Sequence, residues 1–505
     1  MISTFFGLEA ARSGLTAAQS ALYTIGHNVA NAETPGYTRQ RVNLAQKQAY
    51  PTPGRFQPDI PGQFGTGVET ETVQRIRDRF LDVQYRGENA KLGYWTSRSD
   101  ALKKMEDVMN ELTGTGLNET LNQFWQSLQD LATNSAARSV VRQRGVAVAD
   151  TFNYLAQTLQ HNQQDLKNEL NVTTTKINSL LEQINNINKQ IGEVEPNGYL
   201  PNDLYDERDR LLDELSSYVD IKVTPVKSGG NSLEIAEGKV TVELAGVNPP
   251  ITLVDGNRLK TNEFYIDYSG TNDLVQSVSI GARTVDFGSF QSTGSLKSLI
   301  ESYGYTNGAS SVEYGLYPEM MDALDVMAYE FANAFNEVHR NGWSIEDINN
   351  GTQAQLDFFD LGGLTTYKGA AATIRVADEI METPDRIAYS GTGEMGDGSN
   401  ALALAEVKNK PMLIGDQYTT IQTYYENLIG EMAVLAQEAD RMADNSATLA
   451  SSVEDRRKSV SSVSLDEELT NMIQFQHMYN AAARMITLQD EILDRIINGM
   501  GLVGR

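Results

Sequence analysis

Apolar residues at both ends of the chain recur at seven-residue intervals. Near the amino terminus two such rows run three residues apart, through Leu8, Leu15, Leu22 and Val29 and through Ala11, Ala18 and Ile25. Near the carboxyl terminus the rows run through Leu465, Met472, Tyr479, Ile486 and Leu493 and through Phe475, Ala482 and Ile496. A strict seven-residue repeat keeps an apolar seam on one face of a supercoiling helix. We therefore predict that the N- and C-terminal helices pair as a coiled coil.

Charge is scarce in these two predicted helices. Between Met1 and Asn31 only Glu9 and Arg12 are formally charged, and residues 469–483 contain no charged side chain. A helix exposed to water normally has a charged outer face. Two explanations stay open: a helical hairpin buried in one globule, or a rod that other subunits cover. The terminal position favours the second. In a free monomer each seam would bury too little area to offset its ordering entropy, so we expect disordered or loosely helical termini.

The chain between the two ends has further helical patterns. The longest spans roughly 136–192, and its distal half predicts a coiled-coil seam through Leu166, Leu170, Thr173, Ile177, Leu180, Ile184, Ile187 and Ile191. A shorter helix is predicted near 204–219, and another between 317 and 338. The last long helix before the tail has a seven-residue row through Ile421, Leu428, Leu435, Met442 and Leu449. Residues 38–80 are rich in proline and glycine, which predicts an extended, loop-rich segment.

At Asp220 the apolar period changes from that of a helix to two. Residues 221–290 therefore predict an antiparallel β domain inserted into a helical one. The predicted fold class is mainly α with an inserted β domain (α+β, multidomain). The predicted domains are a terminal coiled-coil domain (1–60 with 460–505), a long-helix core domain (61–220 with 310–345 and 400–459), a β-rich insertion (221–309) and a mixed insertion of uncertain assignment (346–399).

Composition narrows the function. The 505 residues bear a formal charge of −26, and no basic stripe compensates it, which argues against nucleic acid or an anionic membrane as partner. The densest basic cluster, Arg456-Arg457-Lys458, is expected to complement a helix C-terminus. The absence of cysteine excludes disulfides and thiol catalysis. No apolar run approaches transmembrane length, and the N-terminus lacks the features of a cleaved secretory signal.

The sequence offers little to an enzyme. Its four histidines (27, 161, 339 and 477) show no metal-ligand spacing, although His27 and His477 could meet across the terminal helices. The run Gly391-Thr392-Gly393-Glu394-Met395-Gly396 has dinucleotide-loop spacing but lacks the strand and helix frame that such a loop needs. The acidic pairs Asp206-Glu207 and Asp466-Glu467 fit helix first turns. We predict no catalytic, cofactor-binding or metal site.

The first helix is followed by Asn31-Ala32-Glu33-Thr34-Pro35-Gly36-Tyr37. Pro35 disfavours a helical conformation at Thr34, and Pro-Gly suits a type II turn with Gly36 at positive φ. Together with Asn28, this turn closely resembles the N-terminal signature of bacterial flagellar rod, hook and hook-associated proteins. Its continuation through Thr38-Arg39-Gln40 resembles the family of first hook-associated proteins (FlgK). Three further segments resemble the same family: residues 201–209 in the middle, and 464–468 and 475–484 in the tail.

The resemblance implies a structural protein at the junction of flagellar hook and filament, outside the cell. It implies export by the flagellar type III apparatus without a cleaved signal. The implied partners are other copies of the chain in a homo-oligomeric helical ring, the hook protein, the second junction protein FlgL, and the export chaperone FlgN at the C-terminal helix. Two alternatives remain: a hook or distal-rod subunit, which shares the turn and terminal heptads, and a secreted coiled-coil adhesin.

Overall fold

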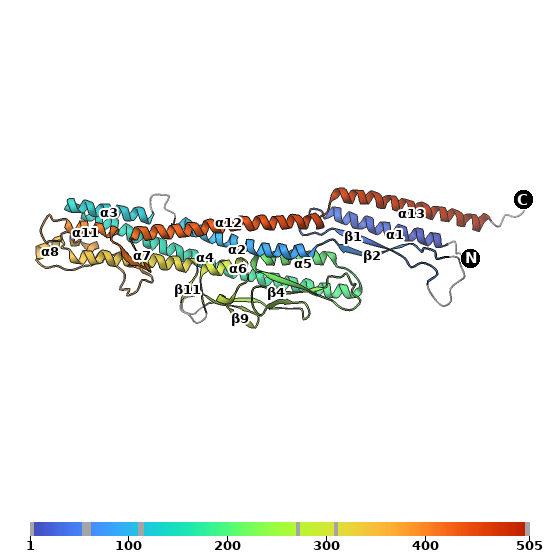
Figure 1. The fold of residues 1–505 in the computed structure, drawn as a ribbon, viewed down its shortest axis with the longest axis horizontal. Helices are drawn as coiled ribbons and strands as arrows, with labels where there is room; N and C mark the ends of the chain where they lie inside the picture. Colours follow the sequence, from blue (N-terminus) through green and yellow to red (C-terminus); the bar gives the residue numbers. More distant parts are fainter. Residues whose placement is uncertain (1–4, 53–61, 110–115, 269–272, 308–311, 500–505) are drawn as a thin grey trace.

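The computed structural model describes residues 5–52, 62–109, 116–268, 273–307 and 312–499. The molecule is strongly elongated, and both chain termini lie at the same end (Figure 1). There the first helix, α1 (Phe5–Ala30), packs against the last, α13 (Leu465–Gly499). The long middle of the chain leaves this end, runs the length of the molecule and returns to it. The predicted pairing of the terminal helices is confirmed.

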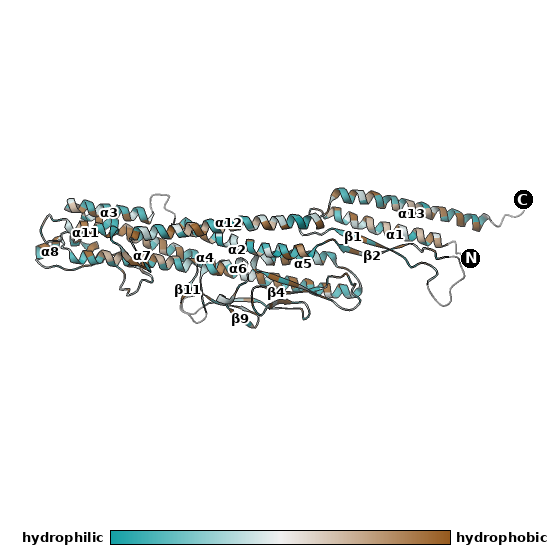
Figure 2. Cartoon of the chain, in the orientation of Figure 1, coloured by the Kyte–Doolittle hydropathy of each residue, from teal (hydrophilic) through white to brown (hydrophobic). Residues whose placement is uncertain are grey.

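Long helices form the body next to this pair. They are α2 (Arg79–Met109), α4 (Arg138–Val194), α7 (Leu316–Asn341) and α12 (Ile421–Ser461). Helix α2 packs along α12, and the shorter α5 (Asn202–Tyr218) and α6 (Ser295–Tyr303) pack between α2 and α4. Apolar stripes on these helices face one another, so a continuous hydrophobic core runs through the body (Figure 2). Among the described residues, this core includes no member of α1 or α13.

The predicted apolar stripe of α4 is buried at all eight positions. It does not face one long partner helix, however, so the coiled-coil interpretation of this stripe is wrong. The stripe packs instead against α5, α6 and the neighbouring strands. An apolar helix stripe can be covered by the face of a sheet as well as by another helix. Asparagines on α4 bind the strand backbones: the Asn178 amide donates to Phe264 O (2.9 Å) and accepts from Phe264 N–H (2.7 Å).

The seven-residue row predicted for α12 drifts out of the core. Leu435 and Leu449 are 39 % and 46 % exposed, whereas Ala436 and Ala450 are buried. A straight helix turns once per 3.6 residues, so a strict step of seven moves around its surface by about 20° per heptad. The buried face of α12 follows that drift, and between Ala436 and Ala450 it consists of small residues, which allows a close approach to α2.

Two small sheets cover one side of the body beneath α4 and α6 (Figure 1). One has the order β3-β4-β5-β6 and is antiparallel: β3 (Ile221–Val226), β4 (Lys239–Leu244), β5 (Ile251–Asp255) and β6 (Lys260–Thr261). The other contains β7 (Phe264–Tyr268), β8 (Val275–Ile280), β9 (Arg283–Asp286), β10 (Tyr305–Thr306) and β11 (Glu313–Tyr314). All strand pairs within residues 221–290 are antiparallel, as predicted, and β10, which lies beyond that range, adds a single parallel bridge to β8.

The end of the body far from the termini is built from short elements. They are α3 (Leu117–Thr133), α8 (Ile345–Asn350), β12 (Phe359–Asp360), α9 (Ala370–Thr373), β13 (Arg375–Val376), α10 (Asp378–Glu382), α11 (Ser399–Glu406), β14 (Met412–Ile414) and β15 (Gln417–Thr419). The chain as a whole also has single 3-10 turns at Ser135–Ala137, Glu195–Asn197, Phe287–Ser289, Pro384–Arg386 and Val407–Asn409. At the far end, five fully buried phenylalanines pack against one another and hold the short elements together: Phe124, Phe331, Phe335, Phe358 and Phe359.

His339 is completely buried at this far end, and its environment requires the neutral ring. Its Nε2 accepts from Ala388 N–H (3.1 Å), so Nδ1 is the nitrogen that donates to Leu356 O (2.7 Å). Burial lowers the pKa of His339 from 6.5 to about 4. Between pH 6.5 and 4 this histidine is protonated in the unfolded chain and neutral in the folded chain. The free energy of unfolding therefore decreases as the pH falls through that range.

We expect the titration of His339 to lower the free energy of unfolding by roughly 3 kcal/mol between pH 7 and pH 4. The measurement is the free energy of denaturant unfolding as a function of pH, for the parent chain and for His339→Gln. The glutamine variant cannot titrate, so its stability should fall less steeply across the window. Equal slopes for the two proteins would contradict the prediction.

Candidate functional site

The terminal helices lie antiparallel, and α1 is held between two neighbours. An ideal Cβ on Gly14 would lie 3.8 Å from Ala482 Cβ, and one on Gly7 would lie 2.8 Å from Gln489 Nε2. An adjacent side of α1 packs on a two-stranded ribbon, β1 (Gln40–Gln46) with β2 (Val68–Arg75), in a segment predicted only as extended and loop-rich. Gly67 allows this close approach. Its φ is +113°, and a Cβ at this position would lie only 2.0 Å from Ser13 Oγ. We call α1, α13 and this ribbon the terminal rod.

All of the predicted seam residues are at least half-buried, with two exceptions. On α1, Ala11, Ala18 and Ile25 are buried, and the other row, Leu8, Leu15, Leu22 and Val29, is half-buried. On α13 the half-buried members are Met472, Phe475, Tyr479, Ala482, Ile486 and Leu493. Leu465 and Ile496 are instead 48 % and 36 % exposed. In the observed register these two positions lie beyond the described ends of α1.

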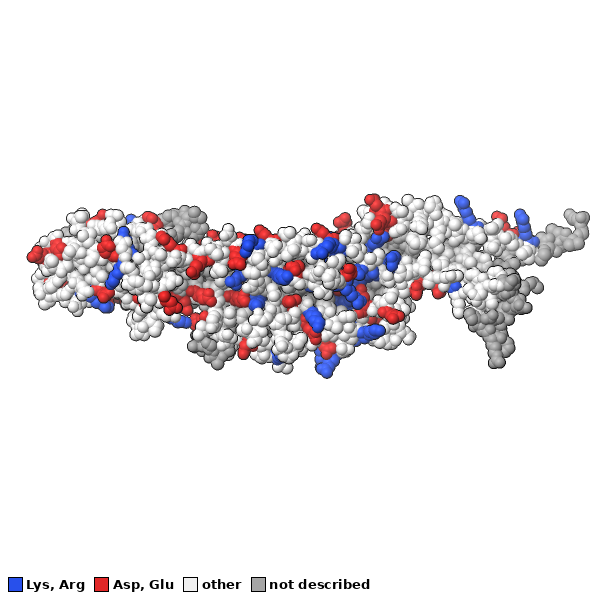
Figure 3. All heavy atoms as spheres, in the orientation of Figure 1, with Lys and Arg blue, Asp and Glu red and all other residues white. Residues whose placement is uncertain are grey.

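Helix α13 has apolar side chains outside the seam as well. Within the described residues, Leu469, Ile473, Leu488 and Ile497 are 50 %, 57 %, 47 % and 73 % exposed. Figure 3 shows few charged residues over the rod on the face drawn, in contrast to the densely charged body. Scattered exposed apolar residues are ordinary, but a long helix with apolar residues on more than one side is expected to be covered by a partner.

The turn after α1 adopts the expected conformation. Tyr37 N–H donates to Thr34 O (3.1 Å), and Gly36 has φ +83°. Asn31 caps the end of the helix, since its backbone and side-chain N–H groups donate to His27 O. The motif residues Asn28, Asn31, Thr34, Pro35, Gly36 and Tyr37 thus form one structural unit, which redirects the chain from α1 into the ribbon.

A hydrogen-bond chain within this unit fixes its shape. Tyr37 O–H donates to Asn28 Oδ1 (2.8 Å), so His27 Nδ1 must be the donor in the 2.9 Å contact with the same hydroxyl oxygen. Asn28 also bridges to the ribbon, where its amide bonds the backbone N–H and C=O of Gln40. Burial and nearby carboxylates raise the pKa of Tyr37 above its usual range, so the phenol stays protonated. His27 does not meet His477, which is exposed.

Replacing Tyr37 by phenylalanine should therefore destabilise the turn by about 1 kcal/mol, because His27 and Asn28 each lose a partner. Amide hydrogen exchange over α1 and the first ribbon residues should become faster in Tyr37→Phe. The matched control is Tyr23→Phe on the same helix, where the side chain is 81 % exposed. Unchanged exchange in Tyr37→Phe, or equal changes in both variants, would contradict this role.

The rod meets the body at a joint made of polar contacts. Thr38 N–H donates to Asp206 Oδ2 on α5 (3.0 Å), and Arg39 N–H donates to Ser461 O at the end of α12 (2.9 Å). The Arg39 guanidinium binds Glu468 (2.8 Å) and Glu467 (2.6 Å) in the first turn of α13. Helices α12 and α13 are separated here by a break at residues 462–464.

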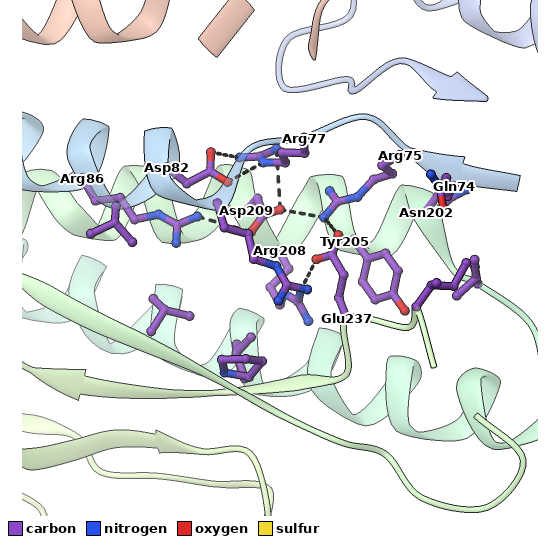
Figure 4. Close-up of a pocket in the computed structure, with 17 residues that line it drawn as sticks. Gln74, Arg75, Arg77, Asp82, Arg86, Asn202, Tyr205, Arg208, Asp209 and Glu237 are labelled. Carbon is purple, nitrogen blue, oxygen red and sulfur yellow. Dashed lines mark hydrogen bonds and ion pairs between the residues drawn. The ribbon is translucent and has the colours of Figure 1, made fainter. Parts of the chain in front are cut away.

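Buried charges extend this joint into the body (Figure 4). Asp209 lies at their centre and receives Arg75 (3.0 Å), Arg86 (3.2 Å) and Arg77 (3.5 Å). The surrounding arginines hold the pKa of Asp209 well below its usual range, although burial acts in the opposite direction. A cavity of about 270 Å³ lies between α2, α5 and the β3–β4 hairpin, and its charged groups already pair with one another: Arg75 with Glu237 (2.6 Å) and Arg208 with Glu237 (3.1 Å).

Sequence reasoning missed this joint. The acidic pairs were expected to serve helix dipoles, but Asp206 binds Arg75 (2.6 Å) and Glu467 binds Arg39. Arg457, expected at a helix end as a dipole partner, binds Asp213 (2.5 Å) and lies over the Tyr85 ring. One signal was available: Asp206, Asp209 and Asp213 are spaced to share one helix face, an unusual pattern for a solvated surface. The segments 28–40, 201–209 and 464–468, distant in sequence, meet here.

In the described part of the chain, no group of three or more His, Asp or Glu residues could hold a metal ion, and none of the helices has the length and apolarity to cross a membrane. The glycine-rich run at 391–396 is a loop before α11. Asp397 closes this loop by accepting from the backbone N–H groups of Gly391 (2.8 Å) and Thr392 (2.9 Å).

Comparison with known proteins agrees with this architecture. A family model described as the flagellar hook-associated protein FlgK helical domain matches residues 102–359. The model for the flagella basal body rod protein matches residues 8–38, and the model for the C-terminal part of the flagellar basal body rod FlgEFG proteins matches residues 459–499. These two segments contain the two helices of the terminal rod defined above, α1 and α13. The solved structure of the flagellar hook junction protein FlgK from Burkholderia pseudomallei has a similar fold (TM-score 0.58, 14 % identity), covering 76 % of this chain and 100 % of that one.

Full-length relatives give the same answer. The flagellar hook-associated protein 1 of Bacillus subtilis (strain 168) is 51 % identical over 100 % of both chains. That of Salmonella typhimurium (strain LT2) is 24 % identical, over 97 % of this chain and 98 % of its own length. With a relative this similar over its whole length and a matching helical-domain model, the chain belongs to the flagellar hook-associated protein 1 (FlgK) family.

Proposed function

We propose that this chain is a structural subunit that joins the flagellar hook to the filament by assembling with copies of itself through the terminal rod. The observation that supports this most directly is the apolar surface that α13 keeps after pairing with α1. A free subunit leaves this surface in water, whereas neighbouring rods in a tubular array would bury it. The seam of Leu8 to Val29 and Met472 to Leu493 would hold each rod together, and the turn at Asn28–Tyr37 would attach it to the body.

The division of labour within the molecule follows from this proposal. Residues 1–60 with 460–505 would form the inner, polymerising layer of a homo-oligomeric helical ring. The long helices of 61–220, 310–345 and 400–459 would form the next layer, and the β-rich insertion at 221–309 would face outward. The far end at 346–399 packs on α3, α4 and α7 and would complete the helical layer.

The proposed partners are the hook protein on one side and the second junction protein FlgL on the other. Before export, the exposed apolar residues of α13 would need cover, and the chaperone FlgN at the C-terminal helix is the proposed source. We further propose export by the flagellar type III apparatus without a cleaved signal. The absence of cysteine suits a chain that crosses a narrow channel unfolded, since no disulfide can form before exit.

The test is electron microscopy of cells that lack this chain, with a parallel assay of the medium for filament protein. Hooks without filaments, together with unassembled filament protein in the medium, are the expected result. Cells without hooks would instead place the chain lower on the axis, as a hook or distal-rod subunit. Normal flagella would overturn the proposal and favour the adhesin alternative.

A further inference from the structure

The seam between α1 and α13 is degenerate along its length. On α1 the row that faces α13 contains Gly7, Gly14 and, in the same register, Ala21. Opposite them on α13 lie Gln489, Ala482 and Phe475, again at steps of seven. Because Gly7, Gly14 and Ala21 are all small, a shift of α13 by one heptad would introduce no large side chain opposite another along this part of the row. Seam packing alone therefore selects the pairing of the helices but not their register.

The covalent connection does not fix the register either. The end of α12 is held by Arg457, which binds Asp213 on α5. Between Arg457 and the start of α13, residues 458–464 include four serines and the break in the helix. Uncoiling the helical residues 458–461 lengthens the linker by about 8 Å, and uncoiling one further residue at the start of α13 brings this to about 10 Å, the displacement of a one-heptad shift. The connection can therefore supply that displacement.

A single side chain connects α13 to the fixed part of the joint. Helix α1 and the ribbon are anchored to the body through Thr38 and Asp206. Among the described residues, the side-chain hydrogen bonds and ion pairs given between α13 and other elements of the chain, apart from its cap at Ser464, all go to Arg39. Its Nε donates to Glu468 (2.8 Å), a residue only 2 % exposed, and its Nη1 donates to Glu467 (2.6 Å). A shift of α13 by one heptad would separate both carboxylates from the guanidinium and leave Arg39 facing apolar or amide side chains.

We propose that Arg39, through Glu467 and Glu468, is the positioning residue that fixes the register of α13 on α1. Polar contacts at one point of a repetitive apolar seam commonly choose among registers that the seam itself accepts. The importance of this register for flagellar assembly rests on the proposed function. The existence of one preferred register does not depend on that function, because it is a property of the single chain and can be measured in the purified protein.

Disulfide trapping in the full-length chain tests the proposal, because the natural sequence contains no cysteine. The pair Gly14→Cys with Ala482→Cys reports the observed register, since the 3.8 Å between Cβ positions matches a disulfide. Gly14→Cys with Phe475→Cys reports a shift of one heptad in one direction, and Ala21→Cys with Ala482→Cys reports the opposite shift. In the observed register each of these two pairs is offset by about 10 Å along the helices, too far to bridge.

In the parent chain we expect only the first pair to cross-link on oxidation. Adding Arg39→Ala should lower its cross-linking rate about two- to threefold, because registers that the seam accepts equally would then share the population, and should make at least one shifted pair cross-link. The control is Arg12→Ala, which removes an exposed arginine of α1 that pairs only with Glu9 on the same helix. Three results would overturn the proposal: an unchanged pattern in Arg39→Ala, loss of the first cross-link without gain of a shifted one, or no cross-link in the parent chain.

Discussion

Replacing Asp209 by asparagine should lower the free energy of unfolding of the body by about 3–5 kcal/mol. The side chain is buried, and Arg75, Arg77 and Arg86 all point at it. Asparagine keeps the shape but removes the charge that these three guanidinium groups share. Each keeps at least one other carboxylate partner, Asp206 for Arg75, Asp82 for Arg77 and Asp213 for Arg86, so the cost is the loss of the buried carboxylate at the centre of the cluster. Chemical denaturation followed by circular dichroism gives the measurement.

Glu207→Gln is the matched control, since it makes the same chemical change two residues earlier on α5. Glu207 binds the neighbouring Arg210 at the surface and should matter by less than about 0.5 kcal/mol. The stabilising effect of the Asp209 carboxylate also has a defined pH range. Because its folded pKa is depressed, the effect is present above the unfolded value near 4 and fades as the pH falls below it. Similar destabilisation by both variants would show that Asp209 is not the centre of the joint.

Removing residues 465–505 should abolish assembly and leave the body folded. The body core contains no residue of α1 or α13 within the described chain, so its packing does not depend on the deleted helix. Assembly should fail completely, because the deletion removes one half of the rod and the exposed apolar surface of α13. Solubility, near-native circular dichroism of the remaining helices, and electron microscopy for polymers or flagella together give the readout. Unfolding of the whole chain would favour a single globule instead.

A point variant separates the outer surface of α13 from its pairing with α1. Ile473→Glu places a charge on a side chain that is 57 % exposed and outside the seam, so monomer stability should change by less than about 0.5 kcal/mol. Assembly should nevertheless be lost, because the interface would have to desolvate that charge. Gln474→Glu adds the same charge at the next position, which is already polar. Normal assembly of Ile473→Glu would place this part of α13 outside the subunit contacts.

Periodicity predicted the elements whose surroundings are uniform. The seams of α1 and α13, the buried stripe of α4 and the change to strands at Asp220 all follow from spacing. The errors arose where an element ends or changes neighbour. Leu465 and Ile496 continue the heptads of α13 beyond the ends of α1, and the row of α12 from Leu435 to Leu449 rotates away from α2. Sequence spacing has no information about where a partner helix stops.

The joint could not be predicted in this way, because its members are charged. The sequence does not show whether an arginine or an aspartate is buried or lies on a solvated surface, because only the tertiary structure brings its partners close. Arg39 and Glu468 are separated by more than four hundred residues and meet at 2.8 Å. The ribbon of β1 and β2 was missed for a related reason: its two strands flank a long excursion rich in proline and glycine, which conceals their pairing.

The placement of both termini at one end of the molecule has a consequence for how the chain folds. Helix α1 is the first helix of the chain, whereas its partner α13 is the last. The body is rich in local contacts, such as those of consecutive helices, but the rod has the highest contact order in the molecule. Closing so long a loop comes late, so the body should acquire its structure first and the rod last. A chain delivered from its amino terminus would then keep its assembling end open until the final residues arrive.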